Sequence, residues 1–79
     1  MKKFYFVFGS DPEFPYQNGW VEVHADDLKG AIAKFRTRIP DRQNGQLNCA
    51  FWYDEAEWAE DSDISINGWF GGFCHEVIE

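Results

Sequence analysis

Two segments within the first 25 positions show the two-residue side-chain period of β-strands. The segment 3–8 is apolar on both alternating faces, which is typical of a central strand that is covered on both sides. The segment 20–25 is apolar on one face only, as in a half-buried strand. The opposing sets are Phe4, Phe6 and Phe8 against Tyr5 and Val7 in the first segment, and Val21, Val23 and Ala25 against Trp20, Glu22 and His24 in the second.

A single apolar stripe then predicts one amphipathic helix that ends before Pro40. Asp26 is the expected N-cap, and Asp27 in the first turn favours the helix dipole. The stripe consists of Leu28, Ala31, Ile32, Phe35 and Ile39.

The second half of the chain predicts a strand, a short helix and a last strand. Residues 47–53 form the expected third strand, and 54–61 form about two helical turns with Asp54 as the cap. The last strand contains 73–78, and 61–68 is a loop with at most one short strand around Ile64 and Ile66. In the third strand, Cys49, Phe51 and Tyr53 are expected on one face and Ala50 and Trp52 on the other.

This order of elements predicts a small α+β single domain, residues 1–79, with an antiparallel or mixed β-sheet of about four strands and one amphipathic helix packed on one face. The other face would carry some of Tyr5, Trp20, Trp52 and the last strand's residues, and it would be partly open. A second subunit could cover that face, so a homo-oligomer is one expectation.

The connection between the first two strands, FGSDPEFPYQNGW, is long for a hairpin. Its two prolines restrict the loop, while Gly9 and Asn18-Gly19 suit its turns. We expect a compact loop with Phe14 packed on the core. Alternatively, the loop displays Asp11, Glu13 and Tyr16 on the same surface as the acids around Trp58.

Charge is distributed unevenly along the chain, whose net charge is −7. All seven Lys and Arg lie between Lys2 and Arg42, whereas 43–79 holds eight acids and no basic residue. This argues against direct nucleic-acid binding, which requires basic residues to displace phosphate counterions. It permits binding to a basic surface, although acidity also simply keeps an aromatic-rich protein in solution.

The sequence has neither a signal-peptide pattern nor an apolar run long enough to span a membrane. Its two cysteines fit a cytoplasmic protein with buried thiols better than a disulfide scaffold. We therefore expect a cytoplasmic protein without membrane contact.

Catalytic and metal-binding patterns are absent from the sequence. His24, Cys49, Cys74 and His75 have zinc-ligand chemistry but lack the local spacing of zinc sites. We expect no enzyme activity and no cofactor or metal.

The densest functional cluster is acidic and surrounds Trp58. It either binds a partner's Arg and Lys side chains or is a solvated helix face that Trp58 anchors to the core. With the loop residues, it gives a candidate partner-binding set of Asp11, Glu13, Tyr16, Asp54, Glu55, Glu57, Trp58, Glu60 and Asp61.

The stretches FGSDPEFPY, GWVEVHADD, AIAKFR, NCAFWYDEAEW and CHEVI together resemble small uncharacterised proteins encoded by bacteriophages and prophages. This resemblance implies the cytoplasm of a bacterial host and a role against host defences. Such phage accessory proteins block a defence enzyme or sequester a nucleotide signal.

Two functions follow as expectations. The first is a non-enzymatic inhibitor that binds a basic, nucleic-acid-handling host defence protein through its acidic, aromatic surface. The alternative is a homo-oligomer that sequesters a nucleotide-type immune signal through stacking rings and basic side chains. Its candidate ligand-binding residues are Tyr16, Trp20, Lys29, Arg36, Arg42 and Trp52.

Overall fold

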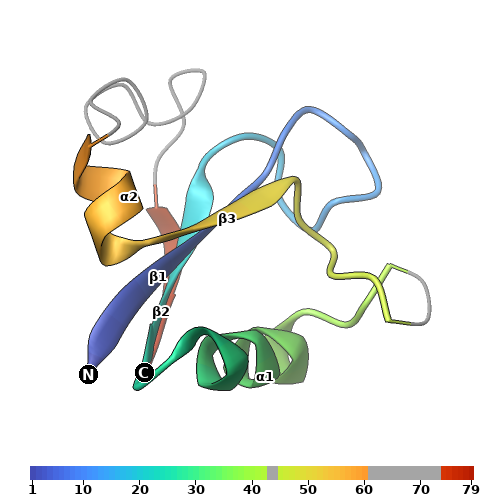
Figure 1. Cartoon of the computed structure of the whole chain (residues 1–79). Coiled ribbons are helices and arrows are strands. Elements are labelled where there is room, and N and C mark those ends of the chain that lie inside the picture. The colour runs from blue at the N-terminus through green and yellow to red at the C-terminus, as the bar shows by residue number, and fades with distance from the viewer. Residues whose placement is uncertain (43–44, 61–73) are drawn as a thin grey trace.

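The computed structural model describes residues 1–42, 45–60 and 74–79, which form a small α+β domain (Figure 1). A four-stranded mixed sheet has the strand order β3-β1-β2-β4. The predicted fold class is therefore confirmed. Along the chain the elements are β1 (Lys2–Val7), β2 (Trp20–Ala25), α1 (Leu28–Arg38), β3 (Phe51–Asp54), α2 (Glu55–Glu60) and β4 (Cys74–Ile78).

Strand β1 lies inside the sheet, with antiparallel β2 on one side and antiparallel β3 on the other. Strand β4 runs parallel to β2. The inner position of β1 explains why its sequence is apolar on both faces. Within the described residues, β3 and β4 are the two edge strands.

Helix α1 covers one face of the sheet through the stripe that the sequence predicted. Ala31 and Phe35 are fully buried, and Ile39 is nearly so. The Phe35 ring stacks on Phe6 of β1 with ring centroids 4.3 Å apart and an interplanar angle of 14°. Leu28, the first residue of the stripe, remains 38% exposed, so the sheet does not cover the start of the helix.

Helix α2 lies against the opposite face and contacts β1 and β3. Its Trp58 stacks on Tyr5, with ring centroids 4.4 Å apart and an interplanar angle of 10°. Tyr5, Val7 and Trp58 are buried together, with Trp20 and Tyr53 packed partly against them. The face expected to be partly open is therefore covered around Tyr5 by this short helix.

The N-cap of α1 is Asp27, whereas the sequence analysis predicted Asp26. Asp27 has an extended backbone, and its Oδ1 accepts a hydrogen bond of 2.7 Å from the Gly30 N–H. This is the N-cap to N3 bond that satisfies a free donor in the first turn. By residue type, either of the two consecutive aspartates can be the N-cap. The residue at which the helix begins makes Asp27 the cap.

The third strand is shorter than predicted, because only 51–54 pair with β1. Cys49 precedes the strand and packs against the α1-side core, so it does not share a face with Tyr53, which packs against Trp58. Trp52 lies opposite Phe6 and therefore faces the α1 side. The expectation that Trp52 shares a face with Tyr5 was wrong, because the strand register decides the face.

The connection between β1 and β2 is a compact loop, as expected. Phe8 N–H donates to the Gly19 carbonyl at 3.0 Å, and Asn18 N–H donates to the Gly9 carbonyl at 2.9 Å. Asn18 and Gly19 supply the positive φ values of the turn, 60° and 76°. Phe14 packs against the core beside Phe8, with ring centroids 5.9 Å apart.

Some predictions lie outside the described residues. These are the segment around Ile64 and Ile66, the first residue of the predicted last strand at 73, and the candidate acid Asp61. None of the helices in the described part of the chain has the length and apolarity needed to cross a membrane.

Burial predicts different reactivities for the two free thiols. Burial raises the pKa of Cys49 to about 12, and it also raises the pKa of Cys74. With a pKa of about 12, roughly one thiol in ten thousand is ionised at about pH 8, compared with about one in four for an unperturbed cysteine. Iodoacetamide should therefore label Cys74 before Cys49, as measured by mass spectrometry of peptides. Labelling in denaturant is the control, and faster labelling of Cys49 in the folded protein would contradict this packing.

Candidate functional site

Helix α2 begins with a reciprocal capping box at the end of β3. Asp54 Oδ1 accepts a hydrogen bond of 2.8 Å from Glu57 N–H, and Glu57 Oε1 accepts one of 3.1 Å from Asp54 N–H. The sequence D-x-x-E encodes this local structure, and the predicted cap at Asp54 is confirmed. Trp58 points onto the sheet and is 9% exposed, which fixes the outward side of the helix.

The carboxylates of this segment face solvent without cationic partners. Asp54, Glu55, Glu57 and Glu60 are all exposed. None of them forms an ion pair with a Lys, Arg or His of residues 1–42, 45–60 and 74–79. The lack of an ion pair distinguishes these four carboxylates from Asp11 and Glu13 of the loop.

Two exposed aromatic residues precede these carboxylates on β3. Phe51 is 52% and Trp52 38% exposed, and their rings lie 5.8 Å apart at an interplanar angle of 20°. Both belong to an edge strand of the described sheet. We call the combined area the β3–α2 surface, and it consists of Phe51, Trp52, Asp54, Glu55, Glu57 and Glu60.

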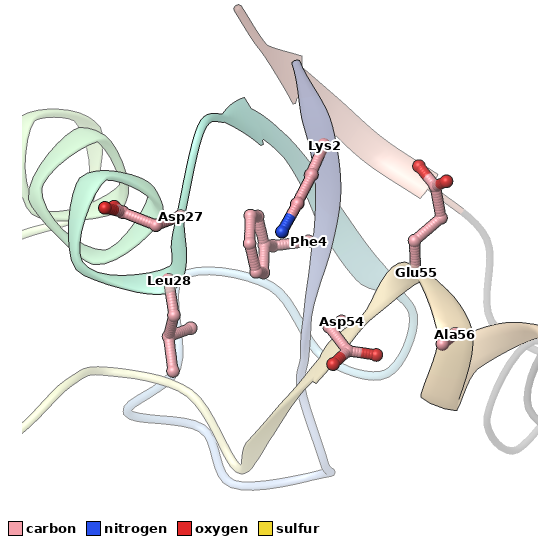
Figure 2. Close-up of a pocket in the computed structure, with 7 residues that line it drawn as sticks. All are labelled: Lys2, Phe4, Asp27, Leu28, Asp54, Glu55 and Ala56. Atoms are coloured by element: carbon pink, nitrogen blue, oxygen red, sulfur yellow. The ribbon is translucent and has the colours of Figure 1, made fainter.

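A pocket adjoins this surface on the α1 side (Figure 2). Its volume is about 390 Å³, which falls within the range of about 300–1,000 Å³ typical of ligand sites. Three segments line it, namely Lys2 and Phe4 of β1, Asp27 and Leu28 at the start of α1, and Asp54–Ala56 where β3 passes into α2. We call it the Asp54 pocket.

The loop acids Asp11 and Glu13 are engaged within the fold. Arg42 Nη2 lies 2.6 Å from Asp11 Oδ2 and 3.6 Å from Glu13 Oε2, and the Arg42 guanidinium lies 4.7 Å from the centre of the Phe14 ring. Hydrogen bonds from the Glu13 N–H and from Arg42 lower the pKa of Asp11. These carboxylates hold the loop in place, and Arg42 neutralises part of their charge.

Tyr16 is also part of this internal packing. Its ring stacks on His75, with centroids 4.3 Å apart and an interplanar angle of 4°, and its hydroxyl donates to Glu76 at 3.4 Å. The loop follows Val7 at the end of β1, whereas α2 follows Asp54, which pairs with Phe4 near the start of β1 (Figure 1). The loop residues and the α2 acids therefore lie at opposite ends of β1 and do not share a surface.

The residues of the alternative ligand set lie apart. Trp20 packs against Trp58 beneath α2, and Arg36 pairs with Asp41 beside the end of α1. Lys29 is exposed on α1, while Trp52 lies on β3. Tyr16 and Arg42 belong to the loop packing. One copy of the chain does not bring these side chains together around a cavity.

Metal ligands do not gather in the described part of the chain, where no group of three or more His, Cys, Asp or Glu side chains could hold a metal ion.

Sequence reasoning identified the acids of this surface but missed its apolar part. Phe51 and Leu28 were assigned to a strand face and to a helix stripe, where they would be covered. Exposure of Phe51 follows from the edge position of β3, and the gap beside Leu28 follows from the packing of α1. Neither has a local signal in the sequence.

The capping box gives a quantitative prediction. Asp54→Ala should lower the free energy of unfolding by about 0.5–2 kcal/mol, because it leaves the Glu57 N–H without its side-chain acceptor. Asp54→Asn should cost much less, because the amide oxygen can replace the carboxylate oxygen. Urea unfolding curves measure both values, and equal losses would show that the cap is not what fixes α2.

Known proteins offer no guide to what this surface binds. No protein-family model, curated protein or solved structure matches the chain. Its function is therefore argued from the β3–α2 surface and the Asp54 pocket.

Proposed function

We propose that this chain is a non-enzymatic binding module whose β3–α2 surface docks on a basic partner protein. The observation that carries the proposal is that exposed aromatic rings and exposed carboxylates follow one another along edge strand β3 and helix α2. Two exposed aromatic rings, Phe51 and Trp52, are followed directly by four carboxylates that have no cationic partner among the described residues.

The two kinds of side chain have complementary roles in such a contact. The rings of Phe51 and Trp52 supply large apolar area, and aromatic residues are enriched among those that dominate binding energy. The carboxylates attract a basic surface during encounter and disfavour acidic ones. A surface that combines both is suited to a protein with exposed Arg and Lys side chains.

A second copy of the same chain is a poorer occupant of this surface. In a two-fold symmetric contact, the same patch meets itself. Asp54, Glu55, Glu57 and Glu60 of one copy would then face the same four residues of the other, and juxtaposed like charges are costly. The charge therefore favours a partner of opposite sign.

The resemblance to phage and prophage accessory proteins suggests the kind of partner. A nucleic-acid-handling host defence protein presents the basic surface that this edge would cover, and covering it would inhibit the protein. The bacterial cytoplasm is the compartment that we propose for this interaction. The alternative, a nucleotide-sequestering homo-oligomer, would need Tyr16, Trp20 and Arg36 to meet across subunits, and no observation favours it.

Binding to a defined basic probe tests this proposal. A fluorescein-labelled peptide rich in Arg and Lys should bind the protein, with fluorescence anisotropy as the readout, and binding should weaken between about 0.05 and about 0.5 M NaCl. The double variant Glu57→Gln/Glu60→Gln should weaken binding about threefold to tenfold, because each exposed charge contact contributes about 0.2–1 kcal/mol.

The matched control is Asp26→Asn/Glu79→Gln. It removes the same charge from two exposed positions outside the β3–α2 surface. Equal weakening by both double variants would show that only net charge matters. A probe that fails to bind, or that binds independently of both salt and Glu57/Glu60, would refute the proposal.

A further inference from the structure

The geometry of the Asp54 pocket points to a more specific role. We propose that it receives one Arg or Lys side chain of the basic partner, so that the pocket selects a single cationic residue within the contact. This inference rests on the proposed function for the identity of the partner. The cation-binding property of the pocket can be tested without that partner.

The apolar lining of the pocket fits the aliphatic part of such a side chain. Phe4, which is only 4% exposed, lies at its base, and Leu28 forms a wall with 38% of its surface exposed. Figure 2 shows Phe4 and Leu28 beside the space between α1 and β3, with the Asp54 carboxylate at its β3 side. Arg and Lys bury their methylene stems on apolar surface of this kind while the charged group stays at a polar rim.

The charge of the lining is predominantly negative. Three of the lining residues are acidic, Asp27, Asp54 and Glu55, and one is basic, Lys2. Figure 2 shows the Asp54 carboxylate at the space beside Leu28, whereas the Asp27 carboxylate is turned toward α1 and the Glu55 carboxylate points away. The backbone fixes each carboxylate through one oxygen, by N–H donors of Gly30, Glu57 and Lys3 at 2.7, 2.8 and 3.2 Å. The other oxygen of each accepts no hydrogen bond from the residues that the structure describes. The Asp54 carboxylate is thus held in place with one oxygen available to a cation, and Asp27 and Glu55 add negative charge nearby.

The positive end of α1 does not reverse this preference. A helix N-terminus favours anions through its free N–H groups. Here the Gly30 N–H already donates to Asp27, and the Glu57 N–H of α2 already donates to Asp54. The carboxylates of the chain itself therefore take the place that an external anion would occupy.

The ring of Trp52 favours an arginine side chain as the ligand of the pocket. It lies on the same face of β3 as Asp54, since the two pair with Phe6 and Phe4 on one face of β1. Its ring is partly exposed. A guanidinium group that reaches Asp54 can lie against this ring, because Arg stacks on aromatic faces while it pairs with a carboxylate.

Lys2 acts as a built-in competitor for the pocket. Its side chain is exposed, makes no ion pair within the described residues, and places its ammonium group beside Phe4 in Figure 2. An incoming cation must approach this like charge. Replacing Lys2 with an uncharged residue of similar length should therefore strengthen cation binding, which a merely structural role of the pocket would not predict.

Saturation-transfer NMR with small probes tests the pocket directly. N-acetyl-arginine methylamide and N-acetyl-lysine methylamide should bind, whereas N-acetyl-citrulline methylamide, which is neutral and has nearly the shape of arginine, should bind much more weakly. Asp54→Asn should weaken binding of the arginine probe about twofold to fivefold, and Lys2→Met should strengthen it about twofold. Asp26→Asn, one residue outside the lining, should have little effect.

The design keeps the fold intact and separates the two proposals. Asn preserves the N-cap acceptor at position 54, and Asp27→Asn gives a second charge-removing variant of the same kind. If the citrulline and arginine probes bind equally, or if Asp54→Asn acts no more strongly than Asp26→Asn, the pocket proposal fails. Peptide binding to the β3–α2 surface can still hold in that case.

Spermidine distinguishes a partner's side chain from a free amine. The Arg/Lys-rich peptide should compete with the arginine probe and should lose affinity in Asp54→Asn. If spermidine binds the pocket but the peptide neither competes with it nor responds to Asp54→Asn, the occupant is a free polyamine and the inference is overturned.

Discussion

The structure depends on one constraint, which is that strand β1 is apolar on both faces and must be covered on both. Helix α1 covers one face, where Phe35 stacks on Phe6. The short helix α2 covers the other, where Trp58 stacks on Tyr5. Each fully buried aromatic residue contributes on the order of 1.5–3 kcal/mol through the hydrophobic effect, with a further 0.5–1.5 kcal/mol for a well-oriented ring pair. In a chain of 79 residues, these two stacks account for the position of both helices.

The candidate site is a consequence of how β1 is covered. Because Trp58 must face the sheet, the carboxylates on the remaining sides of α2 face solvent. Because α1 packs mainly over β2, it leaves Trp52 on β3 and its own Leu28 partly exposed. The acidic surface, the aromatic edge and the pocket between them therefore arise from one packing solution. The loop at 8–19 packs on the same core at the C-terminal end of β1. Its residue Asp11 forms an ion pair with Arg42.

Much of this fold could be predicted from local sequence, because the decisive signals are short-range. Strand alternation, the helical stripe and the D-x-x-E capping box each act within a few residues. What could not be predicted depends on non-local pairing. The register that places Trp52 opposite Phe6 decides its face, and the strand order makes β3 an edge. The Asp54 pocket joins segments separated by more than twenty residues, so no spacing in the sequence reveals it. The acids of α2 were predictable as a cluster, but their lack of a cationic partner within residues 1–42, 45–60 and 74–79 was not.

The central claim is that the β3–α2 surface, and not the loop, binds basic partners. Backbone amide chemical-shift mapping during titration with an Arg/Lys-rich peptide tests this most directly, because it reports on every part of the chain in one experiment. The account predicts that the perturbed amides cluster at 51–60 and at the start of α1, around Asp27 and Leu28. Shifts confined to the loop at 9–19, or spread evenly over all acidic segments, would contradict it.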